Sequence, residues 1–170
     1  LAFQNCEVAV VTNVAADHMG LGGIHTIEAM AKVKAVVPET VFAHGYAVLN
    51  ADDDLVYRMK DDLKCNIGLF SMDENNPRIK EHAAEHGLSC VYENGYVTLM
   101  KGNWKIRVLD VKKIPLTYEG KAVHNINNCL PAVLSAYLFR DITIEDIRTG
   151  LQTFIPSESL TPGRLNFFHF

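Results

Sequence analysis

Three groups of polar residues in this chain have types and spacings that could carry out chemistry. The first group follows a β-branched, apolar run at 8–12, where Asn13, Asp17 and His18 lie in a loop with three glycines. Ligands of doubly wound sheets bind at the carboxyl ends of strands, which is where these side chains are expected. A carboxylate and an imidazole there can hold a divalent cation or orient a phosphate, although an exposed turn is the simpler explanation of this loop alone.

The second group is the sequence HNINN, which occupies residues 124–128 at the start of a predicted helix. An asparagine side chain carries both a donor and an acceptor, so Asn125 or Asn128 could read the edge of a base such as adenine. Asparagine is also a common helix N-cap, and the residues alone do not separate the two interpretations.

The third group is Thr161-Pro162-Gly163-Arg164, which lies in a segment rich in serine and proline. Gly163 would let the backbone approach a ligand, and Arg164 could place its planar fork on phosphate oxygens. An ordinary interdomain turn with a solvated arginine is the simpler explanation of this group taken alone.

Alternating periodicities predict the elements that position these groups. Strands are expected at 8–12, 46–49, 66–71, 88–92, 96–101 and 104–111, and helices at 26–37, 52–63, 77–86, 125–139 and 143–154. The pair Asn94-Gly95 between two apolar runs predicts a hairpin. Asn76 and Gly87 mark the start and the end of the third helix. Strands that alternate with helices and then form a hairpin predict an α/β sheet with an antiparallel extension.

Composition excludes several classes of protein. The 170 residues include 16 Lys and Arg against 20 Asp and Glu, a formal net charge of −4, so we expect no nucleic-acid or anionic-lipid surface. No apolar run approaches the roughly 20 residues that span a bilayer. The four cysteines form no CxxC pair, which argues against a zinc knuckle or a disulfide scaffold and is typical of a reducing cytosol.

Other charged clusters have simple structural explanations. His82 and His86 have the spacing of a zinc pair, but no glutamate follows the first and glutamates flank both, so we interpret them as surface residues. The acidic run at 52–54 suits the positive end of a helix dipole better than a cation. Lys32 and Lys34 both fit a solvated helix face.

Together, and in this order, the segments resemble the central, ATP-binding domain of the Mur ligase family. The matching segments are TNVAADHMGLGG (12–23), AKVKAVV (31–37), YAVLNADD (46–53), HNINN (124–128), GLQTF (150–154) and PGRLNFF (162–168). The resemblance implies a three-layer α/β fold with a mixed sheet over residues 1–154, truncated at its N-terminus. Residues 155–170 would be a linker and the start of the C-terminal domain, and the family's phosphate loop would precede residue 1.

The resemblance also implies an activity that uses ATP and Mg²⁺. Enzymes of this family activate a carboxylate with ATP as an acyl phosphate, which an amine then attacks to form an amide. The sequence DHMGLGG is similar to the branch of the family that adds arginine to aspartate side chains of poly-aspartate. An amino acid and a poly-aspartate-type acceptor are therefore the implied substrates.

The resemblance assigns roles position by position. His18 is implied as a ligand of the second magnesium, and Lys34 as a catalytic residue at the place of a carbamoylated lysine. Arg164 would be catalytic and bind the phosphates. The implied nucleotide-binding residues are Asn13, His124, Asn125 and Asn128, with adenine bound by Asn125 and Asn128. Phosphoryl transfer needs positioned cations more than covalent help from the protein, which suits these residue types.

Two alternatives remain open at this point. The chain could be a relative of peptidoglycan or folylpolyglutamate ligases, or a non-catalytic α/β module that kept the fold. In the leading interpretation, its partner is the rest of the same cytoplasmic polypeptide, without which we expect no turnover. Assembly into homo-oligomers is left open.

Overall fold

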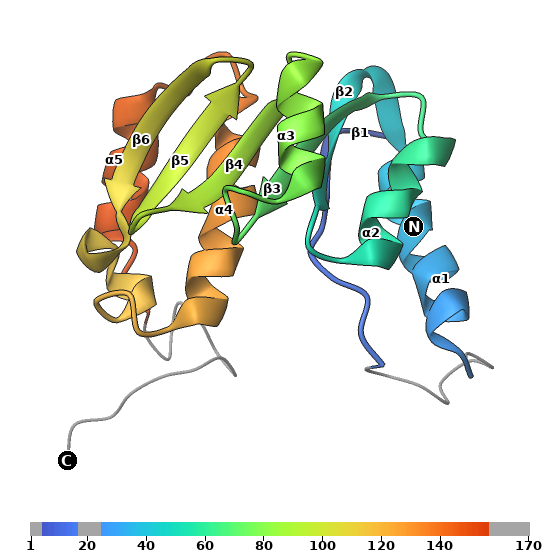
Figure 1. Ribbon diagram of the computed structural model, residues 1–170, viewed down its shortest axis with the longest axis horizontal. Coiled ribbons are helices and arrows are strands. Elements are labelled where there is room, and N and C mark those ends of the chain that lie inside the picture. The colour runs from blue at the N-terminus through green and yellow to red at the C-terminus, as the bar shows by residue number, and fades with distance from the viewer. Residues whose placement is uncertain (1–4, 17–24, 157–170) are drawn as a thin grey trace.

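The computed structural model describes residues 5–16 and 25–156, which fold around one six-stranded sheet (Figure 1). The strands follow one another across the sheet in sequence order. Strands β1 to β4 pair in parallel, and β4, β5 and β6 pair antiparallel. The predicted α/β fold, with a mixed sheet and an antiparallel extension, is confirmed.

The strands agree with the predicted runs except at one place. They are β1 (Cys6–Val11), β2 (Val41–Asn50), β3 (Asn66–Ser71), β4 (Leu88–Glu93), β5 (Tyr96–Lys101) and β6 (Trp104–Asp110). The first half of β2 was missed because it is largely exposed and contains Gly45, so it carries no apolar alternation. Within the described part of the chain, β1 lies at one edge of the sheet.

The described residues also form five helices and three short 3₁₀ turns, of which two helices and two turns follow β6. The helices are α1 (Ile27–Glu39), α2 (Asp54–Arg58), α3 (Pro77–Ala84), α4 (Val123–Tyr137) and α5 (Ile144–Thr153), and the turns are η2 (Met59–Asp62), η3 (Val111–Lys113) and η4 (Pro115–Thr117). The predicted helix at 52–63 is thus shorter and ends in a 3₁₀ turn. None of the described helices is long and apolar enough to cross a membrane.

The helices cover both faces of the sheet and make three layers (Figure 1). Helices α1, α2 and α3 lie on one face, where Met30, Val56 and Ile79 share a hydrophobic cluster. Helices α4 and α5 lie on the other face, where Leu134 and Ile147 belong to a second cluster. Each fully buried side chain of this size contributes about 1.5–3 kcal/mol relative to its exposed state. The two clusters therefore fix the helices on the sheet.

Short-range signals placed two turns correctly. Asn94 and Gly95 have φ angles of 49° and 88°, as the predicted two-residue hairpin requires. Asn76 caps α3, and its side chain accepts a hydrogen bond from the main-chain N–H of Arg78 at 2.9 Å.

The end of α3 differs from the prediction. The helix ends at Ala84, and His86 rather than Gly87 adopts the left-handed conformation, with a φ of 59°. Gly87 is required for another reason, because a Cβ there would lie 2.3 Å from the ring of His82.

Two other helix ends were also predicted wrongly. Pro38 lies in the last turn of α1 instead of interrupting it: the proline removes one main-chain donor, and the helix ends one residue later at Glu39. Helix α4 begins at Val123, two residues earlier than predicted, and its N-cap Ala122 has no side-chain hydrogen bond. Asn125 is therefore a helical residue, and the capping interpretation of this asparagine is wrong.

Candidate functional site

The carboxyl end of β1 brings two of the predicted residues together. Asn13 is exposed as the second residue after the strand, and Lys34 reaches it from α1. The Nζ atom of Lys34 donates a hydrogen bond to the main-chain oxygen of Asn13 at 2.8 Å. Lys32 is exposed on the same helix and instead lines a small groove against α2. Lys34, and not Lys32, thus presents its ammonium group at the strand end where ligands of such sheets bind.

Asn50, at the end of β2, holds the first residue of this loop. Its Nδ2 atom donates to the main-chain oxygen of Thr12 at 2.8 Å, and its Oδ1 atom accepts from the main-chain N–H of Asp52 at 2.9 Å. Only 5% of Asn50 is exposed. A flipped amide would place oxygen against oxygen and donor against donor, so these contacts define a single orientation of the side chain.

Asp53 holds the loop on the other side of Asn13. Its Oδ2 atom accepts a hydrogen bond from the main-chain N–H of Val14 at 2.7 Å. Its Oδ1 atom caps α2 by accepting from the N–H groups of Leu55 at 2.9 Å and Val56 at 3.0 Å. One carboxylate therefore connects the loop after β1 to the first turn of α2.

The neighbouring acidic residues serve the structure. Asp52 accepts from Oγ of Ser71 at 2.6 Å and from the main-chain N–H of Met72 at 2.7 Å, which fixes the loop after β3. Arg78 donates a hydrogen bond to Asp54, and this bond lowers the pKa of Asp54. Among the described residues, no group of three or more His, Cys, Asp or Glu could hold a metal ion. Of the three aspartates, Asp53 and Asp54 lie at the N-terminus of α2, whereas Asp52 holds the loop after β3.

The HNINN segment places its side chains in different surroundings. Asn125 is 9% exposed and donates from Nδ2 to the main-chain oxygen of Leu116 at 2.7 Å, so it braces the start of α4 against η4. This contact uses one of the two N–H donors of the amide. His124 and Asn128 are exposed.

An apolar cavity of about 300 Å³ lies beside Asn128. Its lining comes from the stretch between β6 and α4, from α4 and from the end of α5: Ile114, Leu116, Asn128, Cys129, Ala132, Gly150, Leu151 and Phe154. Burial raises the pKa of Cys129 to about 11, so its thiol is neutral and adds no charge. The volume is at the lower end of the roughly 300–1,000 Å³ of small-molecule sites. The cavity suits a flat, largely apolar ring with one polar edge.

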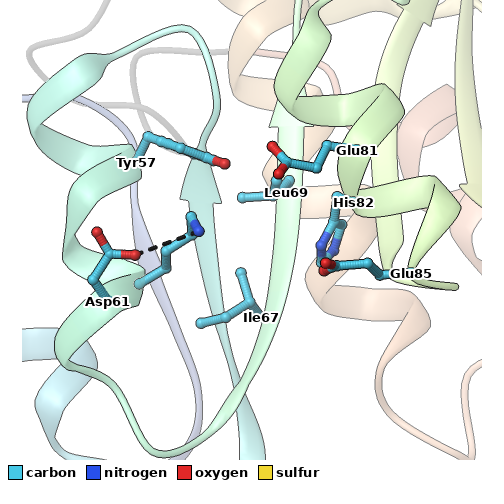
Figure 2. Close-up of a pocket in the computed structure, with 8 residues that line it drawn as sticks. Tyr57, Asp61, Ile67, Leu69, Glu81, His82 and Glu85 are labelled. Atoms are coloured by element: carbon cyan, nitrogen blue, oxygen red, sulfur yellow. Dashed lines mark ion pairs between the residues drawn. The ribbon is translucent and has the colours of Figure 1, made fainter.

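A second cavity, of about 250 Å³, lies between α2 and α3 (Figure 2). Its basic groups have partners within the chain: Lys60 pairs with Asp61 at 3.4 Å and lies over the ring of Tyr57. His82 donates from Nε2 to the main-chain oxygen of Leu88 at 3.2 Å, and burial lowers its pKa. His82 is thus a partly buried structural residue and not the surface residue that the sequence suggested. None of the predicted site residues lines this cavity.

Several predicted residues lie outside the described part of the chain. They are Asp17, His18 and Arg164, together with the PGRLNFF segment. Among the described ones, the structure brings Lys34 to Asn13 and places Asn128 at the apolar cavity.

Sequence reasoning missed three contributors. Asn50 and Asp53 belong to the YAVLNADD segment and Phe154 to GLQTF, so both segments were noticed, but neither had been linked to a ligand site by its chemistry. The signal was present as two polar residues at the end of a buried strand: Asn50 is the last residue of β2, and Asp53 begins the helix that follows, where ligands of parallel sheets bind.

Comparison with known proteins gives a consistent picture. The Mur ligase middle domain matches residues 1–136. The cyanophycin synthetases of Synechocystis sp. and Geminocystis herdmanii are 50% and 49% identical to this chain over 99% of its length. A UDP-N-acetylmuramate–L-alanine ligase of Acetivibrio thermocellus is 30% identical over 86% of the chain and 29% of that ligase. The chain spans about a fifth (19%) of the length of the cyanophycin synthetases that it matches.

Solved structures support the fold. Two crystal structures of MurF from Acinetobacter baumannii superpose with TM-scores of 0.61 and 0.62 at 20% identity. The superposition covers 96% of this chain and 31% and 32% of the MurF chains. At this identity the likeness concerns the fold alone.

Proposed function

The chain belongs to the Mur ligase family, and from this premise we propose that it supplies part of the nucleotide site of an ATP-dependent amide ligase. Its relatives include cyanophycin synthetases and peptidoglycan ligases. We further propose that residues 1–154 form part of the central domain and that 155–170 begin the linker to the next domain. The four free cysteines fit a reducing, cytoplasmic location.

The apolar cavity beside Asn128 is the observation that carries the nucleotide assignment. An adenine ring would fill it with its apolar faces against Leu116, Ala132 and Phe154. Aromatic and apolar faces of this kind bind bases through stacking. The exposed amide of Asn128 has both a donor and an acceptor for the edge of the base.

Asn125 is also proposed to contact the base. One N–H of its amino group donates to the main-chain oxygen of Leu116, which leaves its second N–H and its Oδ1 atom for a ligand. Because these groups include both a donor and an acceptor, the choice of ATP as the nucleotide is proposed from the family alone.

Lys34 and Asn13 are proposed to act at the phosphates. ATP supplies the phosphoryl group that activates the acceptor carboxylate. We propose this role for the unmodified amine of Lys34 and not for the carbamate that the resemblance implies. Its ammonium lies at the carboxyl end of β1, where a fixed positive charge stabilises negative charge that develops on transferring oxygens. Arg164 is proposed to reach the same phosphates from the linker, and His124 to lie beside the adenine.

Magnesium enters the proposal only through the family. The described residues contain no suitable group of three ligands, and His18, the proposed ligand, lies outside them. The residues in view bind and orient the nucleotide.

The substrates are proposed to be arginine and the aspartate side chains of a poly-aspartate acceptor. The identity of 46–50% to five cyanophycin synthetases, against 30–32% to peptidoglycan ligases, supports this branch over the other. A peptidoglycan-type ligase is the second candidate, and a module without catalysis is the third.

The test measures ADP release by the complete gene product that contains this chain. Arginine and poly-aspartate are supplied together and then omitted in turn. We expect release only when both are present, with one ADP formed per arginine incorporated. Lys34→Ala should abolish most of the release, whereas Lys32→Ala, on the same helix, should retain it. Release that requires a muramoyl substrate would replace this proposal with the peptidoglycan ligase, and failure to bind ATP would favour the non-catalytic module.

A further inference from the structure

Side chains from three other elements hold the backbone around Asn13. The main-chain oxygens of Thr12 and Asn13 accept from Asn50 and Lys34, each at 2.8 Å. The next main-chain N–H donates to Asp53 at 2.7 Å. Most backbone groups bond to other backbone groups or to water, so three successive contacts to side chains are unusual. The position of this segment therefore depends on those side chains.

We infer that Asn50 and Asp53 form a clamp that positions Asn13 and, through its main-chain oxygen, the ammonium of Lys34. The role of the clamp in turnover rests on the proposed function, whereas its hold on Lys34 does not. Asn50 and Asp53 are positioning residues, because they contact the loop backbone on either side of Asn13.

The clamp is rigid for reasons visible in its contacts. Asn50 is buried, and both ends of its amide are bonded, one to Thr12 and the other to the main chain at the start of α2. Asp53 uses both oxygens, one for the loop and one for the cap of α2. The Asn13 carbonyl lies between the two anchored positions, Thr12 and Val14. A displacement of about 1 Å at a reacting group can cost on the order of a hundredfold in rate.

One substitution separates the clamp from the helix cap. Asparagine caps a helix as well as aspartate does, so Asp53→Asn keeps α2 capped. It has only one oxygen, however, so its amino group would face the N–H of Val14 and break the contact with the loop. Asn50→Asp breaks the contact between residue 50 and the loop, because a carboxylate cannot donate to the main-chain oxygen of Thr12. The matched control is Asp52→Asn, which loses an acceptor for the loop after β3 instead.

The experiment uses the complete gene product and two readouts. The first is the rate at which an amine-acylating reagent labels Lys34 relative to Lys32, measured by peptide mass spectrometry. Lys32 serves as an internal reference because it is exposed on the same helix. The second readout is the steady-state kinetics of ADP release.

For Asp53→Asn and Asn50→Asp we expect the labelling rate of Lys34 relative to Lys32 to rise about two- to tenfold. This factor corresponds to the loss of one typical hydrogen bond, here the one from Lys34 to Asn13. We also expect kcat to fall at least about tenfold, with KM for ATP changed less than about threefold. Asp52→Asn should leave both readouts unchanged. A wild-type labelling ratio in both clamp variants would overturn the inference, as would an equal loss of kcat in Asp52→Asn. If the wild-type protein releases no ADP, the proposed function fails, and the labelling ratio still decides whether the clamp exists.

Discussion

Removal of the two asparagines proposed to bind adenine should have different consequences. Asn125 is buried, and its amide supplies the hydrogen bond at 2.7 Å to the main-chain oxygen of Leu116. Asn125→Ala would leave that oxygen without its partner, at a cost of about 1–3 kcal/mol of unfolding free energy. For a chain of this length the loss corresponds to a decrease in Tm of roughly 2–12 °C. Asn128 is exposed, so Asn128→Ala should leave Tm within about 1 °C of the wild type.

Nucleotide affinity should show a different pattern. Loss of one ligand hydrogen bond at Asn128 costs about 0.5–1.5 kcal/mol, which raises Kd for ATP about two- to tenfold. Thermal unfolding of this chain without nucleotide and ATP titration of the complete gene product measure the two effects separately. A wild-type Tm for Asn125→Ala would refute the brace at the start of α4. An unchanged Kd for Asn128→Ala would show that the apolar cavity is not the adenine site.

Three other predictions test the fold and the linker. The hydrogen bond from a lysine of β6 holds the pKa of Glu93 below its ordinary value of about 4.5. The ionised Glu93 therefore stabilises the folded chain fully above pH 4.5, and this stabilisation is lost as pH falls through the lower pKa of the folded state. Between about pH 6 and 3, the Tm of the wild type should fall more steeply than that of Glu93→Gln. Gly87→Ala should lower the free energy of unfolding by about 1–3 kcal/mol, because its Cβ would lie 2.3 Å from the ring of His82. Gly150→Ala has open space around it and should be neutral or stabilising by up to about 1 kcal/mol. Urea unfolding measures both effects. In the complete gene product, Arg164→Ala should lower kcat for ADP release at least about tenfold, which corresponds to a barrier higher by on the order of 1.4 kcal/mol, with KM for ATP changed much less. A wild-type kcat in this variant would instead support the interpretation of Arg164 as a solvated linker residue.

Local chemistry explains which elements could be predicted from the sequence. The hairpin turn at Asn94-Gly95 and the cap at Asn76 depend on residues next to one another, so their signals survive without tertiary information. The first half of β2 depends instead on pairing with β1 and has little apolar pattern of its own. Asn125 was misjudged for the same reason, since its partner Leu116 lies in a different element.

Only parts of the candidate site could be predicted, because each motif lies in a short segment whereas the contacts of the site join residues far apart in the sequence. The order of the motifs identified the family, and the family indicated Lys34, Asn125 and Asn128. The clamp joins residues that are 38 and 39 positions apart, through main-chain atoms that carry no sequence signal. No pattern in the sequence could have shown that Asn50 and Asp53 determine where Lys34 lies.

In the acidic run 52–54, the position of each aspartate relative to the end of β2 determines its role. In the sequence the three aspartates are equivalent partners for a helix dipole. In the structure Asp52 holds the loop after β3, Asp53 caps α2 and holds the loop after β1, and Asp54 pairs with a side chain of α3. Each role follows from the direction in which a carboxylate points at the end of β2, and a shift of one residue would exchange them. Since Asp52→Asn and Asp53→Asn make the same chemical change one residue apart, any difference between them must come from the tertiary contacts of the two carboxylates.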